Sequence, residues 1–489
     1  MRCKEIMLLI CLLTLFIPSC YGIKVSLQDA LHVYVFNTTF VKVKRLSYEN
    51  SLLEYDNFRK SLLPSFSLNF TPLSFTHSLR LLQNYSTGEY SNIEEFSNTI
   101  SGGLTIAQKV PLTGGVLTVG SNLSYLKEYA KDKQSYSSVP IYISYSQPLF
   151  GGGKSMNYEK AILKLRNDLA IKEFCTFLST EQQKILSLYL DAYSNKIDIN
   201  FYSKLVSIGD SLLMHTKVKK SIGIITEYDY NQIELQHIDN QIALEKSQYA
   251  YKAAIRLLED ELSIYDIEIE ELSMANFPRH IDEELVLCFV RQNNPLYQQM
   301  DVGRLNAEYT LYQTKINNRF NAHISLSYGL NQYSTTTFRD AYYRPDQQQA
   351  ASITLNIPIY QWGVTRNKLK IAQNEYQTAL LEQEYALKGF KKEIQDYVFD
   401  YNISRELIDV ADRRYNLSAQ QYQFASQKFK LGKMASIELT NANKDFFEAK
   451  QNYISVLKKL FISYYKIRHV SLHDFIVNKD LMDLLPTSF

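Results

Sequence analysis

The sequence is poor in the residues that interrupt secondary structure, with only 17 glycines and 11 prolines among 489 residues. Helices and strands can therefore run far without a break. After residue 22 the sequence also lacks any run of about 18 uninterrupted apolar residues, the length that a membrane-spanning helix needs. We therefore expect no transmembrane helix in the body of the chain, although strands could still enter a membrane.

A dominant charge is missing as well. The 53 basic and 51 acidic residues leave a net charge of +2, without the basic excess of a nucleic-acid-binding protein, so we exclude nucleic acid as a partner. Outside the N-terminal segment only Cys175 and Cys288 remain. We predict two buried free thiols, with a disulfide as the alternative. Tyrosine, by contrast, occurs 37 times and favours boundaries between apolar and wet surroundings.

Residues 1–22 have the pattern of a secretory signal peptide. Arg2 and Lys4 form a basic start, an apolar run covers residues 6–17, and small residues follow as far as Gly22. The segment Ile17-Pro18-Ser19-Cys20 also resembles a lipoprotein box. We therefore predict either cleavage after Gly22 or lipidation at Cys20.

The sequence repeats itself. Gln-Pro-Leu-Phe-Gly-Gly-Gly at 147–153 is echoed by Asn-Ile-Pro-Ile-Tyr-Gln-Trp-Gly at 356–363. Asn37 corresponds to Asn294 at an offset of 294 − 37 = 257, whereas Pro148 corresponds to Pro358 at 358 − 148 = 210. A duplicated unit whose first copy carries an insertion of about 47 residues explains both offsets. We predict a first repeat over 23–275 and a second over 276–489.

Each repeat contains alternating apolar and polar residues, the period of a strand with two different faces. The predicted strands lie near 66–75 and 139–150 in the first repeat and near 323–332 and 351–360 in the second. The insertion adds a candidate hairpin near 102–126, whose place this pattern leaves open. The polar and acidic stretch 86–98 is predicted to be an exposed loop.

Long helical stretches follow, predicted over 154–262 and over 363–466. A break is expected near residues 195–203 in the first and near 402–406 in the second. Gly223 and Gly432 would interrupt each stretch further along, either letting two helices approach or forming a kink. The strand-to-helix joints would be formed by Pro148, Gly151, Gly152, Pro358 and Gly363. Helices of this length need partners along their sides, as in a coiled coil.

Strands with one apolar and one polar face suit the wall of an outer-membrane barrel. Four strands cannot close a barrel, and lipid does not tolerate an open sheet edge. Three chains would pool twelve strands, and their helices would pack into a hollow cylinder. The predicted fold is therefore an α+β membrane protein with a trimeric twelve-stranded barrel and a coiled-coil helical barrel.

These features together resemble the TolC-like outer-membrane efflux family. The resemblance rests on Ser26-Leu27-Gln28-Asp29-Ala30-Leu31, on Asn294-Pro295, on Pro-Leu-Phe-Gly-Gly at 148–152, and on Leu431-Gly432-Lys433 with Ile437-Glu438-Leu439. It implies a homotrimer in bacterial outer-membrane lipid with a periplasmic helical extension. It also implies two partners, a periplasmic adaptor (membrane fusion) protein and an inner-membrane exporter of the RND or ABC type.

No catalytic motif is evident, so we predict no enzyme, no cofactor and no metal site. The pairs His469/His473 and Glu234/His237 have ligand-like spacing but lack a third ligand. Gly151-Gly152-Gly153-Lys154-Ser155 resembles a phosphate loop only in part, because proline stands where the first glycine should be.

Function is instead expected where the helices end at the periplasmic aperture. A ring of like carboxylates held shut by basic partners would gate such a pore. The predicted tip residues are Asn195, Lys196, Asp198, Arg405, Glu406 and Asp409. The predicted function is a passive duct of a tripartite efflux pump or type I secretion system, with drugs, metal ions, peptides and proteins all open as substrates. The alternative is a lipid-anchored coiled-coil surface protein without a pore.

Overall fold

The computed structural model describes residues 23–83, 86–274 and 276–485. These residues form two compact units, and each unit draws on both sequence repeats. Of the described residues, the helical unit comprises those within 23–48, 171–295 and 387–485, and the sheet unit comprises those within 49–170 and 296–386. Helices α3 (Thr39–Lys60), α4 (Gly152–Ser221) and α8 (Val364–Lys430) are divided between the two units, and α7 (Pro295–Asn317) has its first residue in the helical unit.

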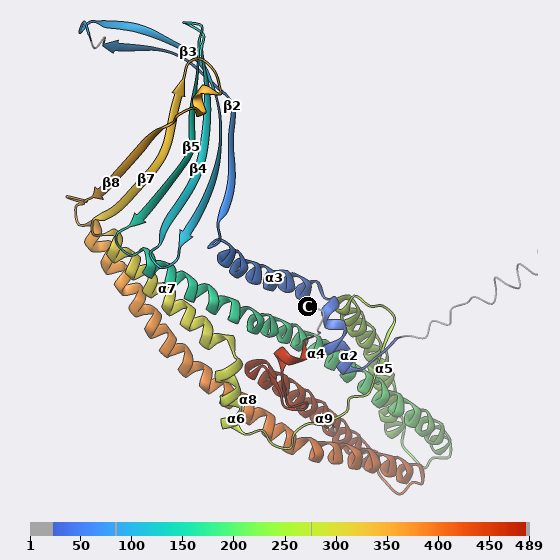
Figure 1. The fold of residues 1–489 in the computed structure, drawn as a ribbon. Coiled ribbons are helices and arrows are strands. Elements are labelled where there is room, and N and C mark those ends of the chain that lie inside the picture. The colour runs from blue at the N-terminus through green and yellow to red at the C-terminus, as the bar shows by residue number, and fades with distance from the viewer. Residues whose placement is uncertain (1–22, 84–85, 275, 486–489) are drawn as a thin grey trace, which may run out of the picture. The chain divides into compact units, whose positions relative to one another are not determined.

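The sheet unit contains one antiparallel sheet of six strands in the order β2-β3-β4-β5-β7-β8 (Figure 1). The strands are β2 (Ser65–Gln83), β3 (Tyr90–Val110), β4 (Gly115–Glu128), β5 (Lys133–Pro148), β7 (Asn321–Ser334) and β8 (Asp346–Asn356). Strands thus occur at all four predicted places, although β8 already ends at Asn356. The sheet of this single chain is open, with β2 and β8 at its edges.

Two predictions about this sheet are wrong. The chain contributes six strands and not four, because the inserted hairpin pairs with both β2 and β5. Residues 90–98 are strand and not loop, since they pair with 75–83 of β2. This part of β3 is almost entirely unpaired on its other side, where the register with β4 begins only at Ser97. A two-stranded extension with solvent around it does not need the apolar alternation that the prediction relied on.

The helical unit is dominated by two helical hairpins. The first consists of α4 and α5 (Glu227–Leu262), and the second of α8 and α9 (Ser436–Ser471). Lys184 lies 2.5 Å from Glu261, and Asp210 lies 3.2 Å from His237. As the residue number rises along α4, the number of the contacted residue on α5 falls, so the two helices are antiparallel. A core cluster joins all four helices and includes Phe201, Leu212, Ile233, Tyr422, Phe429, Leu439 and Phe446.

The remaining elements are short. The helical unit also holds α2 (Leu27–His32), α6 (Glu283–Asn293) and the two-stranded parallel pair of β1 (Ile23–Val25) with β6 (Ile267–Ile269). Helix α7 (Pro295–Asn317) leads to β7. Near the C-terminus, β9 (His473–Asp474) pairs with β10 (Lys479–Asp480).

Within the ranges described, no helix combines the length and the apolar character needed to cross a membrane.

The long helices break where each hairpin turns, and not at the predicted positions near 195–203 and 402–406. Those stretches contain neither glycine nor proline, and α4 and α8 run through them. Gly223 and Gly432 have φ of +76° and +73°, a conformation that glycine adopts at no steric cost. They therefore end helices, and are neither mid-helix kinks nor points of close helix approach.

Both turns have the same hydrogen-bond pattern. In the first, the N–H of Ile224 donates to the carbonyl of Lys219 at 2.9 Å and that of Gly223 to Lys220 at 3.1 Å. In the second, Lys433 donates to Lys428 and Gly432 to Phe429, both at 3.0 Å. This is the Schellman arrangement that satisfies the last carbonyls of a helix. The duplicated sequence has thus kept one turn geometry in both copies.

Candidate functional site

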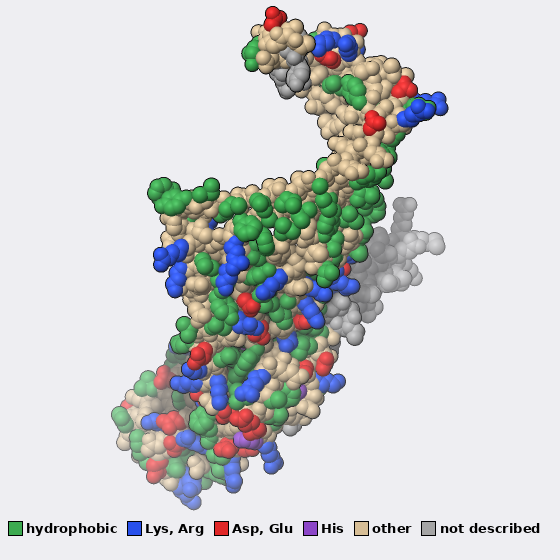
Figure 2. All heavy atoms as spheres, turned by 60° about the vertical axis from the view of Figure 1, so that its left-hand side comes forward, with side chains coloured by type: hydrophobic (Ala, Val, Ile, Leu, Met, Phe, Trp, Pro, Cys, Tyr) green, Lys and Arg blue, Asp and Glu red, His purple; other side chains and the backbone are tan. Residues whose placement is uncertain are grey.

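The first candidate region is the two-faced sheet. Paired residues point to the same face, and Phe66, Ile106, Val119, Ile143 and Tyr328 follow one another across five strands. The aliphatic and phenylalanine side chains on this side, here called the apolar face, include Phe66, Leu68, Phe70, Leu104, Ile106, Leu117, Val119, Ile141, Ile143, Ile324, Leu326, Leu330, Ile353 and Leu355, and they share the side with Gln108, Tyr145, Gln147, Tyr328, Gln347 and Gln349. Phe66 is 77% exposed and Ile353 66% exposed. Figure 2 shows hydrophobic side chains gathered over the sheet.

The opposite side of the same strands is polar and made of small residues. This polar face comprises Ser65, Ser67, Asn69, Thr105, Thr118, Ser144, Ser146, Ser325, Ser327, Ser352 and Thr354. A soluble sheet would turn its apolar side inward and bury it, but here large apolar side chains such as Phe66 and Ile353 are exposed. Apolar-out and polar-in alternation is the arrangement of a wall between lipid and water.

The length of the apolar face fits a bilayer. From Ile324 to Leu330 along β7, six steps of roughly 3.4 Å span about 20 Å, close to the apolar band of about 25 Å in outer-membrane proteins. Aromatic pairs stand towards both ends of the strands. They are Phe96–Tyr129, Tyr125–Tyr136 and Tyr136–Phe338 at one end, and Phe150–Phe320 and Tyr360–Trp362 at the other.

The strand-to-helix joints lie at one end of this sheet. Strand β5 ends at Pro148 and α4 begins at Gly152, and between them Gly151 has φ of +80°. The second joint runs from the end of β8, through Pro358, to the start of α8, with Gly363 at φ of +83°. Both glycines allow the chain to leave the strand direction and enter a helix.

The first joint carries more glycine because the inserted hairpin packs against it. A Cβ built on Gly114 would lie 2.4 Å from the backbone of Gly152, and one on Gly153 would lie 2.2 Å from the carbonyl oxygen of Leu112. The Gln147 side chain donates to the carbonyl of Thr113 at 2.8 Å. The three glycines of 151–153, where the second joint has only one, were the sequence signal for this packing.

This packing predicts a position-specific cost. Gly153→Ala should destabilise the protein, because its Cβ would collide with backbone that cannot move away cheaply. Gly303→Ala on α7 is the matched control, since nothing lies within 4 Å of its Cβ position. It should stabilise by about 0.5–1 kcal/mol, because alanine is the better helix former. Thermal unfolding of both variants, followed by circular dichroism, tests this prediction. Equal shifts of the unfolding temperature in the two variants would contradict the close packing at Gly153.

The second candidate region consists of the two hairpin turns of the helical unit. Their tips expose apolar side chains, with Ile222, Ile224, Leu431 and Ile437 each more than half exposed. Three polar contacts join one hairpin to the other near the turns. Asp229 accepts from Ser436 at 2.6 Å, Lys430 donates to Ser211 at 2.6 Å, and Lys219 donates to the carbonyl of Phe429 at 3.1 Å.

The six predicted tip residues do not lie at these turns. Asn195, Lys196 and Asp198 are inside α4, and Arg405, Glu406 and Asp409 are inside α8. Asp198 is 23 residues before the end of α4 (221 − 198), about 35 Å along the helix. Their placement at a hairpin tip is therefore wrong. It assumed a break near 200 that the uninterrupted helix does not have.

Several of these residues make contacts within the helical unit instead. Lys196 donates to the carbonyl of Ile269 at 2.8 Å, and Arg405 lies 3.3 Å from Asp409 one turn later. Asp198 pairs with Lys450 at 2.6 Å. Asn195 is half-buried and Glu406 is exposed.

Lys450 is the residue that the sequence reasoning missed. Its side chain is fully buried, with its ammonium 4.4 Å from the ring centre of Phe201 and 4.8 Å from that of Phe447. A buried lysine requires a charged or aromatic partner, and here it has both. Its position in the apolar stripe of α9, with Phe446 and Ala449 beside it, was the available signal.

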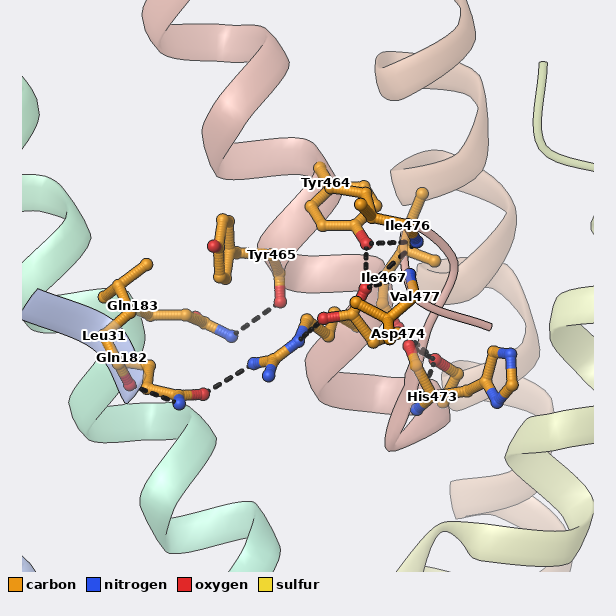
Figure 3. A network of polar contacts seen from close by, with 12 residues as sticks. Leu31, Gln182, Gln183, Tyr464, Tyr465, Ile467, His473, Asp474, Ile476 and Val477 are labelled. Carbon is orange, nitrogen blue, oxygen red and sulfur yellow. Dashed lines mark hydrogen bonds and ion pairs between the residues drawn. The ribbon is translucent and has the colours of Figure 1, made fainter. Parts of the chain in front are cut away.

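A second buried network lies where α4 and α9 meet (Figure 3). The Arg468 guanidinium donates to Asp474 at 2.8 Å and to the Gln182 side chain at 2.6 Å, and Tyr464 donates to Asp474 at 2.8 Å. Burial raises the pKa of Asp474, but the Arg468 charge and these hydrogen bonds outweigh it and hold that pKa below its ordinary value. The ionised pair therefore persists inside the protein.

The predicted metal-like pairs have other surroundings. The ring of His473 stacks on Phe289 at 3.7 Å, and its Nδ1 lies 2.7 Å from Asp480. Burial lowers the pKa of His469, and His237 lies against Asp210. No three histidine, cysteine or acidic side chains of the described chain meet in a group that could hold a metal.

The two cysteines of the body of the chain are free. Cys175 is buried as predicted, but Cys288 is exposed, because it lies on the side of α6 opposite its buried residues. The candidate lipidation site Cys20 and the predicted signal peptide lie outside the described residues.

A carboxyl pair on the first hairpin predicts a pH dependence of stability. Burial, together with a hydrogen bond to Glu261, raises the pKa of Glu181 from 4.5 to about 7. Between these values the folded protein keeps a proton that the unfolded chain has lost, so stability falls as the pH rises from about 4.5 to 7. Glu181→Gln should remove that fall.

Urea midpoints measured at pH 5 and pH 8 test this expectation. From pH 5 to pH 8, the urea midpoint of the wild type should fall relative to the midpoint of Glu181→Gln. The exposed Glu245 on α5 supplies the control, since Glu245→Gln should keep the wild-type difference. If Glu181→Gln showed the same change in urea midpoint between pH 5 and pH 8 as the wild type, the raised pKa of Glu181 would not be the cause of the pH dependence.

The arrangement as a whole defines a class of protein. Solved structures of similar fold include the CmeC outer membrane channel of Campylobacter jejuni, with a TM-score of 0.65, 13% identity, and coverage of 95% of this chain and 90% of that chain. The outer membrane protein VceC of Vibrio cholerae has a TM-score of 0.64 and 10% identity, and the match covers 91% of this chain and 95% of that chain. A membrane protein from Pseudomonas aeruginosa has a TM-score of 0.66 and 12% identity, and the match covers 91% of this chain and 90% of that chain. The chain shares the fold of these solved structures.

Sequence comparison points to the family. Residues 291–470 match the model of the family described as "Outer membrane efflux protein", so the predicted resemblance to TolC-like efflux proteins is confirmed. The same match confirms the predicted localisation in the outer membrane. No curated protein shows a significant sequence match.

Proposed function

We propose that this chain is one subunit of a homotrimeric outer-membrane duct, which passively conducts substrates from the periplasm or from a pump to the exterior. The observation that carries the proposal is the sheet, whose exposed apolar face backs onto a polar face of small residues. Such a wall separates lipid from an aqueous lumen. No chemical step is needed, and transport follows from the supply of substrate at one end.

The open edges of the sheet require more than one copy. Within the described sheet, β2 and β8 each have one side without a partner strand. Unpaired backbone groups cost several kcal/mol each in lipid, so the edges must be covered. Further copies of the chain supply matching strands, as the resemblance to the family implies.

The hairpin turns are the proposed point of contact with the rest of an export system. Their exposed apolar tips, at Ile222, Ile224, Leu431 and Ile437, offer a surface to a periplasmic adaptor protein. The adaptor would connect the duct to an inner-membrane exporter of the RND or ABC type. In this reading the three contacts between the hairpins, among them Asp229–Ser436 and Lys430–Ser211, hold the turns together and keep the periplasmic end narrow.

Conductance in planar lipid bilayers tests the proposal. The purified full-length protein should give discrete conductance steps. Asp229→Ala combined with Lys430→Ala should raise the conductance, because it removes contacts between the hairpins. Lys428→Ala is the matched control, an exposed lysine in the same last turn of α8. The absence of conductance in both the wild type and the double variant would overturn the duct and favour the lipid-anchored surface protein.

A further inference from the structure

We infer that the inserted hairpin β3–β4 is part of the membrane wall, and that three copies of this chain therefore build an eighteen-stranded wall, wider than the twelve strands first expected. This inference rests on the proposed trimeric duct. It adds the width of the lumen, and with it the kind of cargo that fits. Four independent features of the sheet support it.

The inserted strands are fully integrated in the sheet. The register of β3 with β4 is continuous from Ser97↔Glu128 to Val110↔Gly115, and β4 pairs with β5 over nearly its whole length, with one irregularity after Gly120. Among the described strands, β3 and β4 lie between β2 and β5, which do not pair with each other. The hairpin is therefore a piece of the sheet and not a flap lying upon it.

Both faces of the wall continue across the insertion. Leu104, Ile106, Leu117 and Val119 extend the apolar face, and Leu104 is 62% exposed. On the other side, Gly103 and Thr105 of β3 and Thr118 and Gly120 of β4 extend the polar face. An insertion that lay outside the membrane would have no reason to keep an uncharged exposed side in register with its neighbours.

The turn of the inserted hairpin is fixed at the joint end of the wall. Its residues pack on the glycines of the first joint, as described above, and Thr113 lies 3.0 Å from the Tyr145 hydroxyl of β5. The β3–β4 turn is thus level with the start of α4. Short turns on the periplasmic side are typical of outer-membrane walls.

The sheet edges fit one occupant, a second copy of this chain. Because all neighbouring strands are antiparallel, β8 of one copy and β2 of the next run in opposite directions and can pair without a reversal. The apolar face also continues to both edges, with Ile353 and Leu355 on β8 and Phe66 and Leu68 on β2. Three copies of six strands then close into eighteen.

The width of the lumen follows from the strand number. Barrel diameter grows roughly linearly with the number of strands, so eighteen strands give about 1.5 times the diameter and about 2.2 times the cross-section of twelve. The polar face carries mainly serine, threonine and glycine, which do not fill the interior. The duct should therefore accept bulky polar cargo and discriminate little by charge.

The first test measures the pore of the wild-type protein directly. Polyethylene glycols of increasing size are added to planar bilayers on the side where the membrane wall opens, and the size that no longer lowers conductance reports the lumen width of that wall. A strand count of the purified assembly by electron cryo-microscopy accompanies it. Eighteen strands and a correspondingly large exclusion size are expected. Twelve strands, from either three or two copies, or a conducting pore of twelve-strand width would overturn the inference.

The second test uses variants of the inserted strands. Leu117→Lys should reduce the amount of assembled protein in the outer membrane at least tenfold, whereas Thr118→Lys, on the neighbouring residue of the polar face, should assemble normally. Equal assembly of both variants would overturn the inference. In a variant lacking residues 84–132, polymers added on the side of the wall should be excluded at about two thirds of the wild-type size (12/18 ≈ 0.67). Loss of all conductance in the wild type would instead refute the duct itself, so the two failures are distinguishable.

Discussion

Ile143→Lys is expected to abolish stable insertion of the protein in the outer membrane, while Ser144→Lys is expected to leave it nearly unchanged. The two residues are neighbours on β5 and differ in the face on which they lie. A lysine on the lipid side costs about 2–4 kcal/mol near the bilayer midplane, and a symmetric assembly pays this cost in every copy. A lysine on the polar side lies in water.

The measurement is the amount of protein in outer-membrane fractions, together with its resistance to dissociation by detergent at low temperature. Conductance of the Ser144→Lys protein shows that the pore is still formed. If Ile143→Lys assembled as well as Ser144→Lys, the apolar face would not contact lipid, and the membrane interpretation of the sheet would be lost. Leu326→Lys against Ser327→Lys on β7 repeats the comparison at a second site.

Arg468→Leu is expected to lower the free energy of unfolding by about 3–5 kcal/mol, because it leaves the Asp474 carboxylate buried without a cation. Lys444→Leu is the control, since Lys444 is 74% exposed and lies 3.9 Å from Glu448 on the surface of α9. It should cost less than about 1 kcal/mol. Urea unfolding followed at 222 nm measures both.

The pH dependence of this difference follows from the pKa of Asp474. That pKa is lowered in the folded protein, so the stabilisation is complete above the ordinary value of 3.8 and is lost as the pH falls below it. The difference between wild type and Arg468→Leu should therefore shrink in acid below about pH 3.8. Arg468→Leu combined with Asp474→Asn should recover part of the loss, and an equal loss in the double variant would contradict the ion-pair explanation.

Much of the sheet unit could be predicted because its signals are local. Alternation located the strands, and proline with glycine located the joints at Pro148 and Gly363. The strand count could not be predicted, because alternation located the hairpin near 102–126 but could not show that it pairs with both β2 and β5. The number of glycines in the first joint was visible, but its cause became apparent only when Gly153 was found against Leu112.

The helical unit was harder to predict because its determinants are not local. A glycine in a helical pattern can kink a helix, allow close packing or end the helix, and only the positive φ of Gly223 and Gly432 distinguishes these cases. Thr226, which accepts from the N–H of Asp229 at 3.1 Å, was a helix-start signal that would have placed the turn correctly. Asp198, the partner of Lys450, and Gln182, a partner of Arg468, come from α4, more than 200 residues away in sequence, so composition could not reveal them.

The turn of the inserted hairpin, resting on the first joint, limits how such a wall can change in evolution. A hairpin returns the chain to the end of the sheet from which it left, so α4 can start where it did before the insertion. A single added strand would deliver the chain to the far end, where no helix could follow. Walls of this kind should therefore differ between relatives by whole hairpins, and their circumference can grow while the helices remain as they were.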